Sequence, residues 1–426
     1  MIPRKRLDID WSDLLFGMAQ CFRKNSRTTI EAGCKNATPA PDKAICFLSV
    51  RSGLDLLLQV LKFPKGSEVL ISAITIPDIV TILKAHHLIP LPIDLNPDTL
   101  HPDPSDLETK ITPRTVAIII THLFGARVPM DDITPIAKLH GLMIFEDCAQ
   151  GYWGDGYIGH PNSDVCMFSF GPIKLNTALG GALFFLQNPT FQSRVAQRHA
   201  TYGIQNKWRF LQRLLKYSTI KILSHPIIYS IFCSICRLMH KSHDDISFYL
   251  TRGFSGDALF KKLRQQPSYP LLALLHRRLK SNAFARTTRR RESARNFRCL
   301  IPQICCPGFT SNHSFWVFPI LVSNAQKLCK RLLKQGFDAH TWPVSLCVVN
   351  HTKKTSAPHN ALTVQQQILF IPVYPTLTQY RLNQLSRIIC QFARPHDQTP
   401  LWYTSCTRPL HLAVKITNHK SKRHRS

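Results

Sequence analysis

The sequence predicts an α/β protein in which a large, mainly parallel sheet covered by helices is followed by a smaller α+β domain. Three observations predict this fold class. The chain has 426 residues, enough to bury a large core in one two-domain subunit. Between residues 45 and 186, short apolar runs alternate with helical patterns, which is typical of parallel strands joined by helices. Beyond residue 301 the pattern becomes strand, helix, strand and helix, as expected for a second domain.

The predicted elements of the large domain follow in order. Apolar runs of strand length lie at residues 45–50, 69–72, 91–93, 116–121, 142–145, 165–170 and 182–186. Helical patterns lie at residues 11–22, 56–61, 79–86 and 130–139. In the small domain we expect strands at 316–322 and near Phe370, and helices at 325–335 and 379–392.

These patterns divide the chain into four parts. Residues 1–44 form an N-terminal arm with one helix, 45–300 the large domain, and 301–394 the small domain. Residues 395–426 have six Lys and Arg against one Asp and little periodicity, which predicts a disordered basic tail.

The net charge of +29 is high and unevenly distributed. Residues 206–300 contain 20 Lys and Arg against 4 Asp and Glu, which favours an anionic partner such as nucleic acid, phospholipid headgroups or a phosphorylated substrate. A solvated basic face is the plainer interpretation. Nucleic-acid binding has the charge alone in its favour, because no recognition motif accompanies it.

An apolar, basic helical insertion is expected at about residues 207–265. Its densest apolar part, 220–239, is interrupted by Lys221, His225 and Pro226, so it does not resemble a transmembrane helix. Basic ends around an apolar middle are typical of an interfacial segment, with Ile227, Ile228, Ile231 and Phe232 facing the lipid. The alternative is a helical hairpin packed on the subunit or on a second copy.

The cysteines and the N-terminus indicate a cytoplasmic protein. The first residues lack the apolar stretch of a secretory signal, and fourteen cysteines are scattered without a framework, as expected for reduced thiols. Cys233 and Cys236 form a CxxC, but a zinc site needs four ligands and no second pair lies at ligand spacing. We therefore expect no metal. A location at the inner face of a membrane would follow if the insertion is interfacial.

Two charged residues follow the ends of neighbouring predicted strands. Asp147 ends the run that begins at 142, and Lys174 follows the run 165–170 after a turn. Open α/β sheets place their chemistry at the carboxyl ends of strands, so both should lie near one crevice. Lys174 is then either a solvated loop lysine or a Schiff-base lysine whose partner acid pairs the ring nitrogen of pyridoxal phosphate (PLP).

A phosphate site is expected where the helix at 56–61 begins. Ser52, with Asp55 three residues later, is close to a capping box, and a helix start after a strand offers free backbone N–H groups to an anion. A plain capped helix is the alternative.

The amino-acid sequence of these stretches resembles the DegT/DnrJ/StrS family of PLP-dependent sugar aminotransferases. EDCAQ at 146–150, SFGPIK at 169–174 and GGALF at 180–184 are similar to the family's EDAAQ, SFxxxK and GGAL. The resemblance covers residues 45–205 well and 315–378 more weakly. It implies fold type I, a homodimer and PLP as the cofactor.

The resemblance also implies roles for particular residues. Lys174 would hold the cofactor aldehyde as an imine, and Asp147 would keep the pyridine nitrogen protonated. Gln150 would lie near the phenolic oxygen, and Ile76 against the ring face. Three further residues would hold the phosphate: Ser52, Gly53 and Ser169.

The predicted function is the transfer of an amino group from an amino acid such as glutamate to a keto-sugar, nucleotide-linked or related. Lys174 favours this reaction, because family members that dehydrate sugars lack the lysine. Leu54 stands where the family has threonine, and the family's Asn-Tyr-Arg motif is missing after Gly203. These departures leave the acceptor open. They also leave the alternative of a degenerate member that keeps the fold as a binding or scaffold protein, including at a membrane surface.

Overall fold

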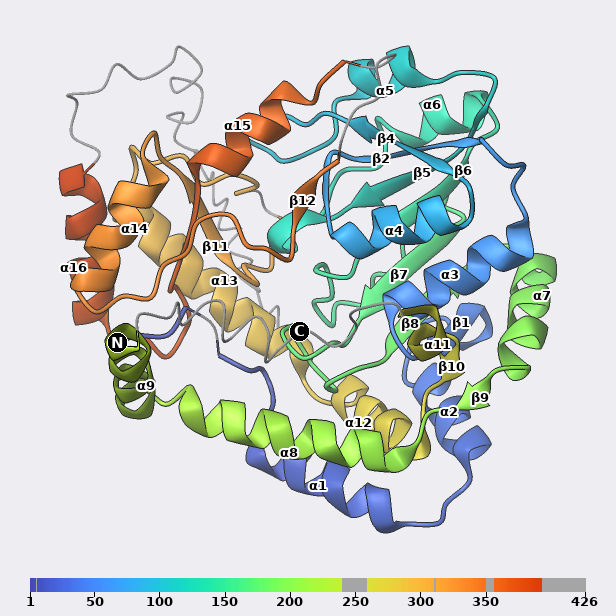
Figure 1. Ribbon diagram of the computed structural model, residues 1–426, viewed down its shortest axis with the longest axis horizontal. Helices are drawn as coiled ribbons and strands as arrows, with labels where there is room; N and C mark the ends of the chain where they lie inside the picture. The colour runs from blue at the N-terminus through green and yellow to red at the C-terminus, as the bar shows by residue number, and fades with distance from the viewer. Residues whose placement is uncertain (5, 240–258, 310–311, 350–355, 393–426) are drawn as a thin grey trace, which may run out of the picture.

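The computed structural model describes residues 1–4, 6–239, 259–309, 312–349 and 356–392. The predicted tail and part of the predicted insertion lie outside these residues. Figure 1 shows a large sheet-containing body from which the chain passes, through one long helix, into a smaller body that holds the last helices.

The large body is built on a seven-stranded sheet of order β1-β8-β7-β6-β5-β2-β4. The strands, in chain order, are β1 (Ala44–Phe47), β2 (Glu68–Ser72), β4 (Ile89–Ile93), β5 (Thr115–Thr121), β6 (Met143–Asp147), β7 (Val165–Ser169) and β8 (Ala182–Leu186). Strands β4, β2, β5, β6 and β7 pair in parallel, whereas β8 runs antiparallel to both of its neighbours. The sheet is therefore mainly parallel, and the predicted fold class is confirmed.

Helices cover both faces of the sheet because alternate strand residues point to opposite sides. Val69 and Ile119 join the core under α3 (Val50–Leu61), α4 (Pro77–Ala85) and α7 (Pro189–Ala200). Leu70 and Ile118 join a second core under α5 (Pro104–Lys110) and α6 (Thr134–Leu139).

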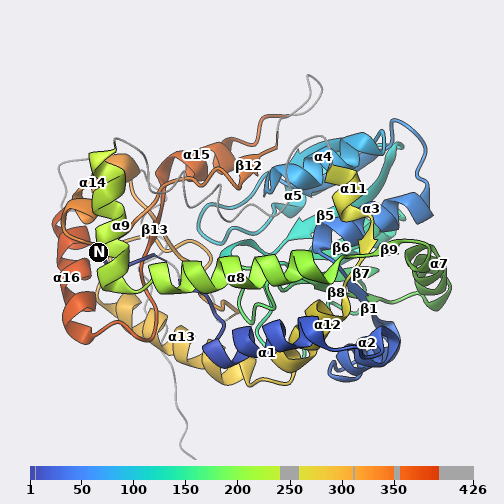
Figure 2. The ribbon, with the colours of Figure 1, turned by 60° about the horizontal axis from the view of Figure 1, so that its bottom comes forward.

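A layer of helices closes one side of the large body. Most of helix α12 (Tyr269–Leu279) is buried, and it packs against α1 (Trp11–Phe22), α2 (Arg27–Asn36) and α8 (Lys207–Leu223). Figures 1 and 2 both show α1 and α8 side by side, and the rings of Phe22 and Trp208 meet edge to face across them. The helices of the predicted arm thus form part of the main core.

The small body is joined through α13 (Ala283–Cys299). It pairs β11 (Phe318–Leu321) antiparallel with β13 (Ile368–Ile371) and packs them against α14 (Ala325–Lys334) and α16 (Gln379–Phe392). Shorter elements complete the description: η1 (Pro41–Lys43), β3 (Ile74–Thr75), η2 (Leu123–Gly125), β9 (Gly203–Ile204), α9 (Pro226–Leu238), α11 (Leu259–Leu263), β10 (Gln265–Gln266), β12 (Cys347–Val348) and α15 (His359–Gln367).

The chain crosses between the two bodies in two further places. Ile2 forms a parallel bridge to Phe337 in the small body, and β12 pairs with β3 in the large one. The N-terminal residues are therefore held between the bodies, beside the carboxyl ends of the sheet strands.

Several helix starts differ from the predictions for local reasons. The helix expected at 130–139 begins only at Thr134, with Pro135 in its first turn, where the missing N–H costs nothing. Helices α2, α5 and α7 were not predicted, because their sequences bury few apolar residues and carry little periodicity. Helix α7 begins after Asn188, whose side chain accepts a hydrogen bond from the Phe191 N–H. An asparagine at this position is a common helix cap, and it was the one sequence feature that could have predicted the start of α7.

Candidate active site

The structure places Asp147 and Lys174 at the same edge of the sheet. Asp147 is the last residue of β6 and is buried, and its Oδ1 accepts the Ala149 N–H at 3.0 Å. Burial raises the pKa of Asp147, which the Ala149 hydrogen bond and the charge of Lys174 only partly oppose. Burial lowers the pKa of Lys174 to about 8, although the charge of Asp147 works against this. An amine of that pKa is partly deprotonated near neutral pH, so it can attack a carbonyl.

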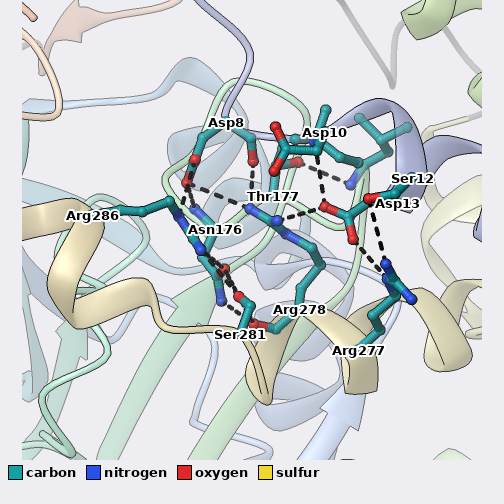
Figure 3. A network of polar contacts seen from close by, with 12 residues as sticks. Asp8, Asp10, Ser12, Asp13, Asn176, Thr177, Arg277, Arg278, Ser281 and Arg286 are labelled. Carbon is teal, nitrogen blue, oxygen red and sulfur yellow. Dashed lines mark hydrogen bonds and ion pairs between the residues drawn. The ribbon is translucent and has the colours of Figure 1, made fainter. Parts of the chain in front are cut away.

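The loop that carries Lys174 is fixed through Asn176. Asn176 has a left-handed φ of 54°, and its backbone N–H donates to Asp8 Oδ2 at 2.5 Å. Its side-chain amide donates to the Arg278 carbonyl at 2.9 Å and accepts from Arg286 Nη2 at 2.6 Å. Figure 3 shows these side chains converging on Asn176 from the N-terminal segment, α12 and α13. The position of Lys174 thus depends on three distant parts of the chain.

A buried arginine ties this network to α1. Arg278 is 2% exposed, and its Nη1 lies 2.6 Å from Asp13 Oδ2, while its Nη2 donates to the Asp8 carbonyl at 2.6 Å. Burial alone would raise the pKa of Asp13, but Arg277 and Arg278 hold it below its ordinary value. Sequence reasoning missed these residues. The one available signal was an arginine adjoining the apolar run of α12, which must find a partner if it is buried.

The first turn of α3 differs from the expected cap. The helix begins at Val50, and its cap is Ser49, whose Oγ accepts the Ser52 N–H at 3.1 Å. Ser52 therefore lies inside the first turn, and the proposed capping box of Ser52 and Asp55 is wrong. The Gly53 N–H bonds to the Ser49 carbonyl at 3.0 Å. The helix start still lies at the edge of the sheet that holds Asp147 and Lys174, because β1, which precedes it, runs parallel to β7.

Gly53 is required by packing. A Cβ at this position would lie 2.3 Å from the ring of Phe184 on β8. Only glycine lets α3 approach the sheet this closely. A role of Ser52 and Gly53 at a phosphate stays a prediction.

The three remaining predicted residues have local partners. Gln150 is buried, and its Oε1 accepts the N–H of Phe124 at 2.8 Å, which holds that residue's left-handed turn. The Ser169 hydroxyl accepts the Gly171 N–H at 3.3 Å, at the start of the loop that leads to Lys174. Ile76 precedes α4 and packs on the main core. Their cofactor contacts stay predictions.

A buried acid beside Asp147 has a structural role. Glu146 accepts hydrogen bonds from His122 Nε2 at 3.0 Å, the Tyr157 hydroxyl at 2.6 Å and the His160 N–H at 2.6 Å. Together with Cys148, His122 and Glu146 bring three possible ligand atoms within 4.8 Å of one another. However, His122 Nδ1 accepts the Val128 N–H at 2.9 Å, so both ring nitrogens are occupied by protein groups. The cluster is complete without an ion.

The Glu146 cluster gives a pH-dependent stability. Burial would raise the pKa of Glu146, but its hydrogen bonds, that of His122 foremost, hold the pKa well below its usual range. A carboxyl group whose pKa is lower in the folded state contributes its full stabilisation at pH values above its unfolded pKa, about 4.3 for a glutamate. That contribution decreases as the pH falls from there toward the folded-state pKa. In Glu146→Gln, one carboxylate oxygen becomes an NH₂ group, which cannot accept a hydrogen bond. It must face at least one of the donors from His122, Tyr157 and His160. We expect a loss of about 3 kcal/mol at pH 7 and a flatter profile below pH 4.5 in urea unfolding.

The control for this measurement is Asp131→Asn. The carboxyl group of Asp131 is exposed and contacts only the side chain of His160 among the described residues. Its replacement should leave the unfolding free energy within about 0.5 kcal/mol of the wild type. Equal profiles for Glu146→Gln and the wild type would contradict the assignment.

Trp316 adds an aromatic wall to the site. Its indole N–H donates to the Ile173 carbonyl at 2.6 Å, and Lys174 Nζ lies 4.4 Å from its ring centroid. The cation–π contact holds the amine over the ring while it is charged. Trp316 comes from the small body, and only its aromatic character could have singled it out in the sequence.

Comparisons with known proteins agree with this arrangement. Residues 38–218 match the model of the DegT/DnrJ/EryC1/StrS aminotransferase family. A curated relative, L-glutamine:2-deoxy-scyllo-inosose aminotransferase of Micromonospora echinospora, is 36% identical over 101 residues. That match covers 24% of this chain and 24% of the relative, so the chain spans about a quarter of the length of the curated relative it matches.

Solved structures share the fold over most of both chains. The aminotransferase TlmJ from Streptoalloteichus hindustanus has a TM-score of 0.67 at 17% identity, covering 91% of this chain and 98% of its own. A sugar aminotransferase from Micromonospora echinospora has a TM-score of 0.65 at 20% identity, covering 92% and 100%. NtdA from Bacillus subtilis, solved with the cofactor PMP, has a TM-score of 0.64 at 19% identity, covering 89% and 82%. These likenesses establish fold type I.

Proposed function

Since residues 38–218 belong to the DegT/DnrJ/EryC1/StrS aminotransferase family, we propose that the protein is a PLP-dependent aminotransferase. Its amino donor is an amino acid such as glutamate, and its acceptor is the keto group of a sugar, nucleotide-linked or closely related. Aminotransferases of this family depend on PLP. The single observation that carries the proposal is the placement of a half-buried lysine, Lys174, and a buried acid, Asp147, close enough at the carboxyl end of the sheet for their charges to interact.

The residues present fit the cofactor. Among the described residues, Asp147 uses one carboxylate oxygen, Oδ1, for a hydrogen bond and leaves Oδ2 without one. A buried carboxylate with a free oxygen suits a protonated pyridine nitrogen, because a charge-assisted hydrogen bond would satisfy it. Lys174 supplies the amine for the aldehyde, and the start of α3 faces the same edge, where a phosphate could accept N–H groups.

Bound PLP would supply a carbonyl for the amino group and a ring that accepts electrons from the substrate. The chain's own residues do the rest. Lys174 would hold the cofactor through its amine, and as a free amine it would move a proton at the substrate carbon next to nitrogen. Asp147 would accept a hydrogen bond from the protonated ring nitrogen. Asn176 fixes the loop that carries Lys174, and Trp316 holds its charged amine, so these two residues position the lysine for both roles.

The test is chemical labelling of the purified protein. Saturation with PLP should give visible absorbance, and borohydride reduction followed by peptide mapping should place the label on Lys174. The same experiment separates the alternative of a scaffold protein, which would take up no PLP or carry the label elsewhere. A label on another lysine would refute the assignment.

We also propose that the protein is cytoplasmic and rests on an anionic membrane surface through α8 and α9. Helix α8 has five Lys and Arg and no acidic residue. Helix α9 exposes an apolar stripe one turn apart, with Ile227 67%, Ile231 56% and Ile235 50% exposed. Among the described residues, no single helix is long and apolar enough to cross a membrane, whereas α8 and α9 together meet those criteria across a 93° bend. A basic, apolar surface of this kind fits an interfacial location.

Liposome binding tests this location. Binding should increase with the content of anionic lipid and decrease with salt, because each basic residue near the surface contributes roughly 1 kcal/mol. Phe232 is half-buried, so the exposed pair Ile227→Asp and Ile231→Asp is the informative variant, and it should abolish binding. Leu139→Asp, at an exposed leucine on α6, is the control. If the wild type ignores anionic liposomes at low salt, the stripe instead packs on a second copy in the homodimer.

A further inference from the structure

A pocket beside Lys174 contains an excess of positive charge. It lies where the N-terminal segment, the Lys174 loop, α13 and the small body meet, and we call it the arginine pocket. Its polar and aromatic lining includes Arg6, Lys174, Arg290, Trp316 and Tyr374. Because Lys174 belongs to this lining, a molecule that reacts at the lysine can extend into the pocket.

Arg290 lacks a polar partner among the residues that the structure describes. Within the described parts of the chain, its guanidinium group forms no hydrogen bond and no ion pair. Arg6 donates to the Thr376 hydroxyl at 2.9 Å and contacts no carboxylate among the same residues. Of the three arginines in the lining, Arg4 is paired with Asp338, whereas Arg6 and Arg290 contact no acid among the described residues.

The acid in the pocket lining is already engaged elsewhere. Asp8 Oδ1 lies 3.4 Å from Arg286 Nε, and its Oδ2 accepts the Asn176 N–H and lies 3.6 Å from Arg278 Nη2. Figure 3 shows the carboxylate of Asp8 directed at these groups. Asp8 therefore serves the network that fixes the Lys174 loop, and among the described residues it forms no ion pair with Arg290.

A guanidinium group that is partly buried without an ion-pair partner weakens folding, and such groups concentrate at functional sites. Burial lowers the pKa of Arg290, with the charge of Asp8 opposing it only in part. Guanidinium groups bind planar oxyanions, carboxylates and phosphates, through paired N–H donors.

We propose that the arginine pocket is an anion subsite in which Arg290, assisted by Arg6, binds a carboxylate or phosphate of the substrate whose reacting carbon lies at Lys174. The inference rests on the proposed aminotransferase function. The anion is either the carboxylate of a dicarboxylic amino donor or the diphosphate of a nucleotide-linked acceptor.

The experiment measures anion binding to the PLP-loaded protein by calorimetry. Glutarate stands for the donor and uridine diphosphate for the acceptor. Arg290→Gln should weaken binding of the anion that uses the pocket by 10- to 100-fold, whereas Arg290→Lys, which keeps the charge but loses the paired donors, should weaken it less. Arg289→Gln, at an exposed neighbour on the same helix, is the matched control and should bind as the wild type does.

Each outcome bears on the proposal. A loss confined to glutarate assigns the subsite to the donor, a loss confined to uridine diphosphate assigns it to the acceptor, and a loss of both means that the two substrates share it. Unchanged binding of both anions in Arg290→Gln, or no binding of either to the wild type, overturns the proposal. The visible absorbance and the borohydride label on Lys174 should be the same in all variants. Failure of those two readouts would instead refute the aminotransferase function.

Discussion

Lys174→Ala is expected to lower aminotransfer by a factor of about 10⁴ or more, because the variant loses both the amine that holds the cofactor and the group that moves the proton at the substrate carbon. The Lys174 amine has a pKa of about 8, low enough for a useful fraction to be unprotonated at neutral pH. Stopped-flow absorbance with glutamate as donor would measure the first half of the reaction separately from the second.

The matched control for this variant is Lys138→Ala. Lys138 lies on α6, is about half exposed and pairs with Asp164 at 3.5 Å. Its replacement should change neither the rate nor the site of the borohydride label. Retention of the label in Lys174→Ala would mean that another lysine reacts with the cofactor, and the proposed centre would be wrong.

Asp147→Asn is expected to bind the cofactor and to lose at least two orders of magnitude in turnover, which corresponds to about 3 kcal/mol in the barrier. The amide cannot hold a proton on the ring nitrogen as a carboxylate does. The side chain is similar in size and Asp147 is buried at the end of β6, so the fold should be kept.

The cofactor's absorbance spectrum is the second readout for Asp147→Asn. A change in that spectrum together with a low rate would place Asp147 at the ring, whereas Asp131→Asn, at an exposed position, should leave both unchanged. Near-normal turnover would show that Asp147 is a structural acid.

The main features of the large domain could be predicted from the sequence. The strand at 182–186 and the helix at 11–22 have the predicted bounds, because apolar runs and helical periodicity are local properties. Asp147 and Lys174 could also be singled out in advance, because parallel strands bring their carboxyl ends to one edge. The residue that caps α3 could not be identified from the sequence, because serines stand at both 49 and 52 and either could cap a helix.

What the sequence by itself determined is thus the order of the sheet strands and of the helices with clear periodicity, the two charged residues that follow or end neighbouring strands, and a family resemblance that the match over residues 38–218 confirms. Only the tertiary structure decided which distant side chains meet. Asp13 and Arg278 are 265 positions apart in the chain, yet they form one buried ion pair behind the Lys174 loop. The arginine pocket likewise joins the N-terminal segment, α13 and the small body. Hydrophobic periodicity reports which face of an element is buried, whereas the pairing of buried charges depends on how elements pack in space, which no local pattern encodes.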